Sequence, residues 1–350
     1  MPQPRIYLDH AATTPIVRQA RAAMLAGLES WHNPNSPHAE GRAAKAALEQ
    51  ARARVAAALG WKGHVIFTSG ASEALAIALG RAKGGRRFVS AVEHDAVFRA
   101  APDAARLDVD CSGQVRLEAV AGERPVVAVQ HANNETGIVQ PLDEIGKEIR
   151  ARGGLLIADC AQTAGKIELP DADIIAISAH KFGGPPGVGA LLVLDLGLVE
   201  AVGGQEQGYR PGTQNLPGIN AMGAALELGS EWIEAAARLR ERLEGAILAA
   251  GGEVVGSGPH RLVTIGAYRM PGVAAAAQLI QFDLAGIAIS AGSACSSGSL
   301  KPSHVLQALG MEDVAADEVI RVSFGRCTTA EEVDRFIALW SEMAGRRRAA

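Results

Sequence analysis

Two polar residues stand at or shortly after the ends of apolar runs in the middle of the chain. Asp159 closes the run Leu155–Ala158, and Lys181 follows the run Ile174–Ile177. A lysine beside a buried strand can have a lowered pKa and form a Schiff base, and a strand-end carboxylate can hold a pyridinium nitrogen. Taken separately, Asp159 could cap a helix and Lys181 could be a surface charge. Taken together, with two glycines after Lys181 that permit close approach, they favour a functional site at one sheet edge.

A possible phosphate seat precedes them in the chain. The segment Thr68–Glu73 predicts a strand end, a tight turn and the start of a helix, whose N–H groups can bind phosphate, although an ordinary capped turn has the same pattern. The pair Gly165-Lys166 is not part of a Walker A loop, because Cys160 stands where the first glycine belongs and Ile167 where Ser or Thr belongs. Nucleotide hydrolysis therefore has no support.

Apolar runs alternate with segments of helical period over most of the chain. This alternation predicts a mostly parallel sheet with helices on both faces. The predicted strands are Val65–Thr68, Phe88–Ala91, Val126–Gln130, Leu155–Ala158, Ile174–Ile177 and Val188–Leu194, and the predicted helices are Gly41–Leu59, Ser72–Lys83 and Asp143–Arg152. From about Gly218 a long helical stretch runs toward Ala249, mixed short strands and helices follow, and Thr329–Ala344 predicts a last helix. We expect a domain boundary near residue 240.

Composition limits the class of protein. The chain has 350 residues, 48% of them hydrophobic, with 34 Lys and Arg against 38 Asp and Glu. This composition predicts a folded protein with one large and one smaller domain, and the mildly acidic balance gives no general attraction to nucleic acid or anionic lipid. The sequence has no apolar run of membrane-spanning length and no signal-peptide pattern, so we expect a cytoplasmic protein without a membrane segment.

The four cysteines differ in their surroundings. Cys111, Cys160, Cys295 and Cys327 have no C-x-x-C spacing, so neither a metal site nor a disulfide scaffold is expected. We expect three of them, Cys111, Cys160 and Cys327, to be small hydrophobic or incidental residues. Cys295 is different because it stands among the serines, glycines and alanines of Ser290–Leu300. That composition predicts a mobile, partly solvated loop that can deliver a thiolate.

The chain resembles the cysteine desulfurases, the sulfur-mobilising branch of the class V, fold-type I pyridoxal-phosphate enzymes. Seven motifs occur in the same order as in that family: Tyr7–Thr14, Asn33–His38, Phe67–Glu73, Asn133–Gly137, Ser178–Lys181, Gly203–Glu206 and Arg210–Thr213. The resemblance implies an α/β fold with a mostly parallel seven-stranded sheet and a smaller α+β domain. The large domain would span 14–240, and 1–13 with 241–350 would form the small domain that carries the Cys295 loop.

The resemblance also implies roles for single residues. Lys181 would hold pyridoxal 5′-phosphate, Asp159 would keep its pyridine nitrogen protonated, and His94 would stack on the ring. Arg321 would bind the substrate carboxylate, and Cys295 is the residue that separates desulfurases from aminotransferases. Gln162 and Asn134 would lie near the phenolic oxygen, and Asn134 would also contact the substrate carboxylate. The phosphate would be bound by Ala71, Ser72, Ser178 and His180. The resemblance also implies a homodimer, in which Thr213 of the second subunit contacts the same phosphate.

The implied reaction converts L-cysteine and an acceptor thiol to L-alanine and a persulfide. Lys181 would remove the Cα proton, His94 would move a proton near the sulfur, and Cys295 would take up the sulfur before a sulfur-acceptor protein, such as an iron–sulfur scaffold, receives it. The alternatives are a selenocysteine lyase, a class V aminotransferase, or a scaffold paralogue that binds the cofactor without turnover. Gln207 stands where the family commonly has arginine, which alters the entrance.

Overall fold

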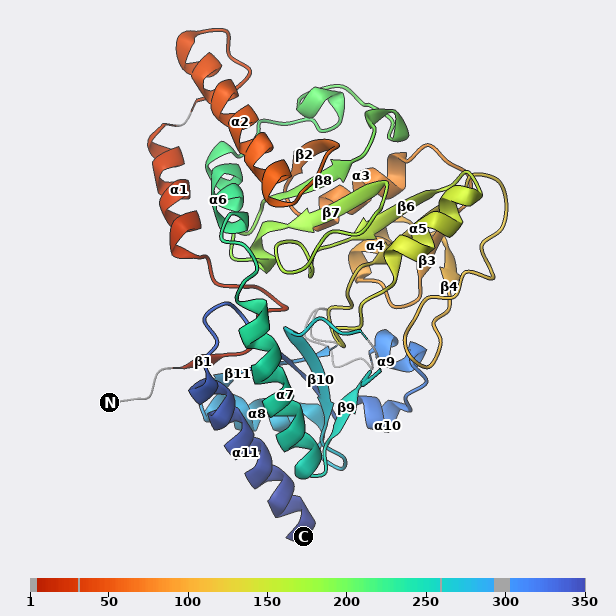
Figure 1. Ribbon diagram of the computed structural model, residues 1–350, viewed down its shortest axis with the longest axis vertical. Helices are drawn as coiled ribbons and strands as arrows, with labels where there is room; N and C mark the ends of the chain where they lie inside the picture. Colours follow the sequence, from red (N-terminus) through yellow and green to blue (C-terminus); the bar gives the residue numbers. More distant parts are fainter. Residues whose placement is uncertain (1–4, 31, 259, 293–302, 350) are drawn as a thin grey trace.

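The two larger sheets of the described residues differ in size. The computed structural model describes residues 5–30, 32–258, 260–292 and 303–349, and Figure 1 shows a seven-stranded sheet in the upper part of the molecule and a smaller sheet in the lower part. The α/β fold predicted from the sequence is therefore confirmed, with a mixed, mostly parallel large sheet and a second, smaller sheet domain.

The large sheet has the strand order β2-β8-β7-β6-β5-β3-β4. Its pairs are parallel from β4 through β7, whereas β8 runs antiparallel to both β7 and β2. The strands are β2 (His64–Thr68), β3 (Arg87–Ser90), β4 (Ala105–Leu107), β5 (Val126–Gln130), β6 (Leu155–Asp159), β7 (Ile174–Ser178) and β8 (Gly189–Val193). The sequence predicted all of these strands except β4, a short edge strand with no extended apolar run.

Helices cover both faces of this sheet because its central strands are apolar on both sides. In β6, Leu156 and Ala158 pack toward one core, and Ile157 packs toward the other. The first core includes residues of α1 (Arg18–Glu29), α2 (Ala39–Ala58), α5 (Leu142–Ala151) and α6 (Leu216–Leu226), and the second includes residues of α3 (Ala71–Arg81) and α4 (Asp95–Ala100).

The smaller sheet is antiparallel, with the order β12-β13-β10-β9, and the chain start joins this part through the parallel pair β1–β11. Tyr268, Phe282, Phe336 and Trp340 are fully buried in its core. The elements are β1 (Ile6–Tyr7), α7 (Ile233–Ala249), β9 (Glu253–Val255), β10 (Ile265–Arg269), α8 (Ala275–Leu284), β11 (Ile287–Ala288), β12 (Ser290–Ala291), α9 (His304–Ala308), α10 (Asp313–Ala316), β13 (Val319–Ser323) and α11 (Ala330–Ala349).

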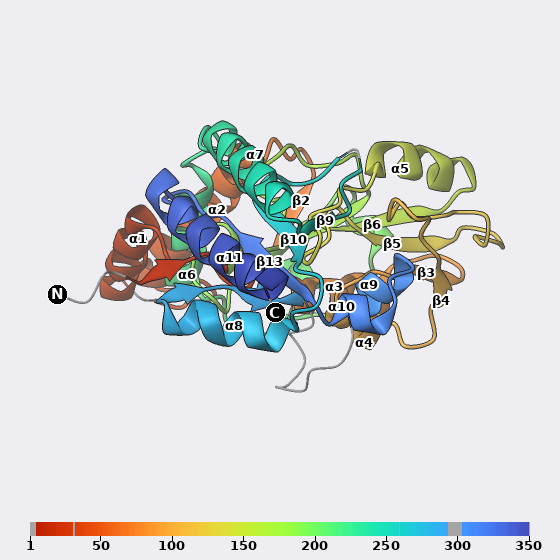
Figure 2. The same cartoon turned by 90° about the horizontal axis from the view of Figure 1, so that it is seen from below.

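The predicted long helical stretch from Gly218 to Ala249 is wrong in one respect: it is two helices. The segment 227–232 separates α6 from α7, and Gly229 there has φ +67°, a conformation that ends a helix. The predicted boundary at residue 240 falls inside α7, which packs against β9 and lies beside α11 (Figures 1 and 2). The division into a large domain, 14–240, and a small domain, 1–13 with 241–350, stays a prediction.

Candidate active site

A cavity of about 340 Å³ opens at the carboxyl ends of β5, β6 and β7. This is the edge at which open α/β sheets bind their ligands. The cavity brings together side chains from widely separated parts of the chain. Nine of the predicted site residues line it: Ala71, Ser72, His94, Asn134, Asp159, Gln162, Ser178, His180 and Lys181.

Lys181 ends the short 3₁₀ helix η1 (Ala179–Lys181), which follows β7 directly. Its Nζ donates hydrogen bonds to the carbonyl oxygens of Ala11, at 2.6 Å, and Ala12, at 2.9 Å. Both carbonyl groups belong to the turn that follows β1, about 170 positions earlier in the chain. These contacts cannot be predicted from the sequence, because backbone acceptors carry no residue signature.

Asp159 is the last residue of β6 and is 8% exposed. Its Oδ1 accepts the backbone N–H of Ala161 at 2.9 Å. Burial raises the pKa of this carboxyl group, and the nearby His94 and Lys181 pull the pKa down. A buried carboxylate of this kind is stabilised by a cationic N–H donor, which is what a protonated pyridine ring presents.

His94 stands immediately before α4, where its Nδ1 accepts the backbone N–H of Ala96 at 3.1 Å. Because Nδ1 is used as an acceptor, the neutral ring carries its hydrogen on Nε2. Burial lowers the pKa of His94, and the charge of Lys181 lowers it further while that of Asp159 raises it. The ring is therefore a neutral imidazole at neutral pH, and its Nε2–H has no hydrogen-bond acceptor among the described residues.

The start of α3 and the end of β7 form the anion-binding end of the cavity. The first-turn N–H groups at Ala71 and Ser72 have no acceptor within the helix. Ser178 stands at the head of η1, but its hydroxyl makes no capping bond. His180 Nδ1 lies 3.1 Å from Thr13 Oγ1, and burial lowers the pKa of His180 to about 4, so this ring is also neutral. Such neutral donors suit an oxyanion.

The Gln162 side chain gives a direct test of whether a bound group fits here. Its Nε2 donates to Ala11 O at 2.9 Å, while its Oε1 is buried without a hydrogen-bond partner among the described residues. A buried amide oxygen of this kind calls for a donor from a bound group. Together with the phosphate seat, the buried acid and the strand-end lysine, it fits pyridoxal 5′-phosphate. In the part of the chain described, no cluster of metal-binding side chains occurs.

Arg321 is not among the residues that line this cavity. It lies on β13, is 2% exposed, and donates from Nη2 to Asp9 Oδ1 at 2.8 Å and from Nη1 to the carbonyl oxygen of Asn134 at 3.0 Å. The predicted carboxylate-binding arginine is thus paired with Asp9 near the start of the chain. Its contact with the cavity is indirect, through the backbone of the lining residue Asn134.

Thr213 is exposed and lies outside the cavity of its own chain. The turn before it, η3 (Glu206–Gly208), is anchored by the buried Glu206 carboxylate, which accepts hydrogen bonds from Arg52 at 2.7 Å and Gln214 at 3.0 Å. Glu206 and Gln207 both have positive φ, +49° and +58°. The motif is visible in the sequence, whereas its anchoring contacts to Arg52 and Gln214 are visible only in the structure.

Cys295 lies outside the described residues. The described residues on either side of its segment both meet Glu135: Ser303 Oγ donates to Glu135 Oε2 at 2.5 Å, and a Cβ atom on Gly292 would lie only 2.3 Å from the same oxygen. Glu135 is 5% exposed, and burial raises its pKa. In the sequence Glu135 appears only as part of the motif Asn133–Gly137, which gives no sign of this contact.

Comparisons with known proteins identify the family. The family model "Aminotransferase class-V" matches residues 6–336. The cysteine desulfurase IscS of Anaeromyxobacter sp. is 38% identical, with 95% of this chain and 91% of the relative covered, and the putative cysteine desulfurase IscS 1 of Bacillus subtilis is 36% identical, with 94% and 96% covered.

Solved structures agree with this assignment. The NifS-like protein from Rickettsia africae has a TM-score of 0.87 at 30% identity, with 97% of this chain and 99% of that one covered, and a second NifS-like protein has a TM-score of 0.88 at 29% identity with the same coverage. With a family match over nearly its whole length, the chain belongs to the class-V aminotransferase family, among its cysteine desulfurase homologues.

Proposed function

We propose that this protein is a pyridoxal-phosphate-dependent cysteine desulfurase, which converts L-cysteine to L-alanine and carries the sulfur as a persulfide on Cys295. One observation carries the proposal: Lys181, Asp159 and His94 line one small cavity beside a helix N-terminus. The chain that holds them is 36 to 38% identical to proteins named cysteine desulfurases. Each group in that cavity has a use in this chemistry.

The cofactor would be held at both ends. Ala71, Ser72, Ser178 and His180 would bind its phosphate, Asp159 would pair with its ring nitrogen, and His94 would lie on the ring face. Gln162 and Asn134 would contact its phenolic side. When bound, pyridoxal phosphate supplies an electron sink for the charge left at Cα of an amino acid.

Lys181 is the group in position to move the substrate Cα proton. Its Nζ accepts that proton, and the Ala11 and Ala12 carbonyl oxygens then stabilise the resulting ammonium at the same place. Proton transfer by a positioned base contributes a factor of about 10²–10⁴ in rate. His94 offers Nε2–H as a hydrogen-bond donor to the substrate sulfur, because its Nδ1 is already committed to Ala96.

The substrate carboxylate and the partners complete the proposal. Asn134 and Arg321 would bind the carboxylate, and for this the Arg321 guanidinium would share its donors with Asp9. Thr213, exposed on a firmly anchored turn, would reach the phosphate of a second subunit in a homodimer. A cytoplasmic sulfur-acceptor protein such as an iron–sulfur scaffold would take the persulfide.

The test is the fate of L-cysteine with purified holoenzyme. We expect alanine and sulfane sulfur in equal amounts, because the thiolate of Cys295 removes the sulfur while the carbon skeleton keeps its amino group. Cys295→Ser should keep the cofactor absorbance and form no sulfide. Cys327→Ser, which changes an exposed cysteine, is the matched control and should remain active. Amino-group transfer to a keto acid would indicate an aminotransferase, pyruvate with ammonia would indicate elimination, and wild-type sulfide release by Cys295→Ser would refute the thiolate role.

A further inference from the structure

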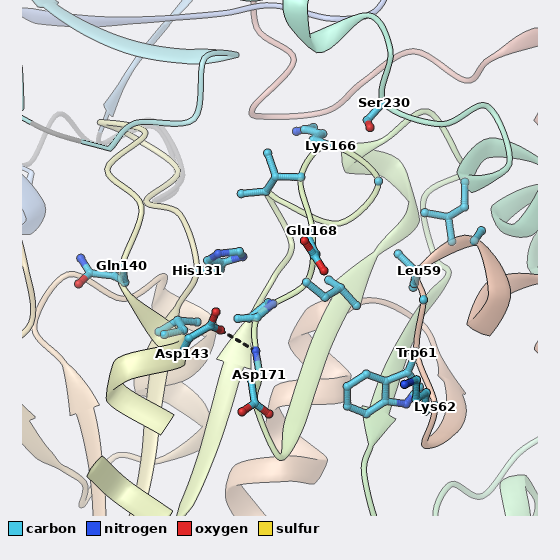
Figure 3. Close-up of a pocket in the computed structure, with 18 of the residues that line it drawn as sticks. Leu59, Trp61, Lys62, His131, Gln140, Asp143, Lys166, Glu168, Asp171 and Ser230 are labelled. Atoms are coloured by element: carbon cyan, nitrogen blue, oxygen red, sulfur yellow. Dashed lines mark hydrogen bonds between the residues drawn. The ribbon is translucent and has the colours of Figure 1, made fainter. Parts of the chain in front are cut away.

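A second and larger cavity, of about 840 Å³, lies on another part of the large domain (Figure 3). It is bordered by the end of α2, the start of α5, the turns that follow β6 and the segment after α6. Among the described residues, the two cavities share no lining residue. Its size falls within the range of about 300–1,000 Å³ typical of small-molecule sites.

Lys166 is the unusual residue of this cavity. It is 5% exposed, and among the described residues its Nζ makes no hydrogen bond or ion pair. In Figure 3, Lys166 lies near Ser230 at one end of the cavity, whereas Trp61 and Lys62 lie at the other. A buried ammonium group without a partner is unfavourable, so folded proteins pair such groups or shift their pKa.

Among the described residues, no opposite charge raises the pKa of Lys166. The titratable groups that interact with it are Lys181, His10 and His180, and burial lowers the pKa of both histidines to about 4, so both are neutral. Burial and then the charge of Lys181 lower the pKa of Lys166 to about 7. An anion bound next to this amine would therefore favour its protonated, cationic form.

The carboxylates of the cavity belong to its rim. Asp143 Oδ1 accepts the backbone N–H of Asp171 at 2.8 Å, and Asp171 pairs with Arg150 at 2.5 Å. Asp143 and Asp171 are exposed, and so are Glu144 and Glu168. Water therefore screens the charges of these four carboxylates. None of them forms an ion pair with Lys166 among the described residues.

We propose that this cavity binds a small oxyanion, the carboxylate or phosphate group of a small molecule, through the Lys166 ammonium group. An ammonium group forms its strongest hydrogen bonds with such oxygens. The cavity is much larger than a bare ion, and Leu59, Trp61 and Leu169 give it apolar surface for the remainder of the molecule. This cavity shares no lining residue with the cavity of the proposed desulfurase reaction, although Lys166 senses the charge of Lys181.

Calorimetric titration of the holoenzyme with acetate, and separately with inorganic phosphate, tests this proposal. The cofactor's own phosphate then occupies the cup at α3 and cannot be confused with the new site. We expect one anion per chain, with binding at least tenfold weaker in Lys166→Met. Lys166→Arg, which keeps the charge, should retain most of the affinity. Lys62→Met removes an exposed lysine from the far end of the same cavity and should change the affinity less than twofold.

The acetate titration should also weaken with pH. Acetate is fully ionised throughout, so a loss of affinity between about pH 6.5 and about pH 8.5 would follow deprotonation of Lys166 in the wild-type protein. A crystal soaked in selenate should show its anomalous peak next to Lys166 Nζ, which needs no variant. The proposal is overturned if neither anion binds at millimolar concentration, or if Lys62→Met weakens binding as much as Lys166→Met does.

Discussion

Lys181 and Lys166 make an informative pair. Each follows a strand of the same sheet, Lys181 after β7 and Lys166 after β6, and each lines a cavity. Lys181 Nζ is held by two backbone carbonyl groups, whereas Lys166 has neither a hydrogen bond nor an ion pair among the described residues. The difference is that two lysines after buried strands of one sheet meet different acceptors: backbone carbonyl groups for Lys181, and none among the described residues for Lys166.

The largest expected effect separates these two lysines by activity. Lys181→Ala should lower desulfurase turnover by about 10³-fold or more, since it removes both the amine that holds the cofactor and the base at Cα. Lys166→Met is the matched change in the other cavity. It should keep the visible absorbance of the bound cofactor, and its turnover should stay within about threefold of the wild-type value. That loss is much smaller than the factor of about 10²–10⁴ that a catalytic base contributes. The measurement is alanine release from L-cysteine beside an absorption spectrum. Equal losses in the two variants would contradict the comparison.

A smaller effect concerns stability and pH. The pKa of Lys166 is about 7 in the folded protein and 10.5 for an ordinary lysine, so between these values the unfolded chain binds the extra proton. The free energy of unfolding should therefore rise with pH in this window and fall toward neutral pH. From about pH 7.5 to about pH 9, the wild type should gain up to about 2 kcal/mol relative to Lys166→Met, at about 1.4 kcal/mol per pH unit.

Urea unfolding of both proteins at the two pH values measures this gain. Lys62→Met serves as the control, because an exposed lysine has little to lose or gain on folding. Parallel pH profiles for the wild type and Lys166→Met would mean that Lys166 is not a buried, deprotonating group.

Much of the fold could be predicted because its signals are local. The strand β6, for example, is an apolar run closed by Asp159, and its mates show the same pattern. The break between α6 and α7 has little signal in the sequence, because Gly229 lies in an otherwise helical stretch. The structure shows that α6 ends at Leu226 and that Gly229, with positive φ, lies in the segment that follows. Local periodicity therefore predicts elements better than it predicts where one helix becomes two.

The candidate site was predictable in its residue types but not in its contacts. The motifs singled out Lys181, Asp159 and His94, which the fold brings to one cavity. The carbonyl groups that hold Lys181 are distant in sequence and backbone in origin, so no pattern of side chains reveals them. The sequence shows Lys166 only as part of a segment that does not match a Walker A loop. Its burial without a partner among the described residues is a property of the tertiary structure, so the sequence does not reveal it.

The most direct test is to find which lysine carries the cofactor. Borohydride reduction of the holoenzyme fixes the cofactor to its amine, and mass spectrometry of the digested protein then locates it. We expect the modification on Lys181 alone, with Lys166 unmodified. A modification on Lys166, or none on either lysine, would contradict the account.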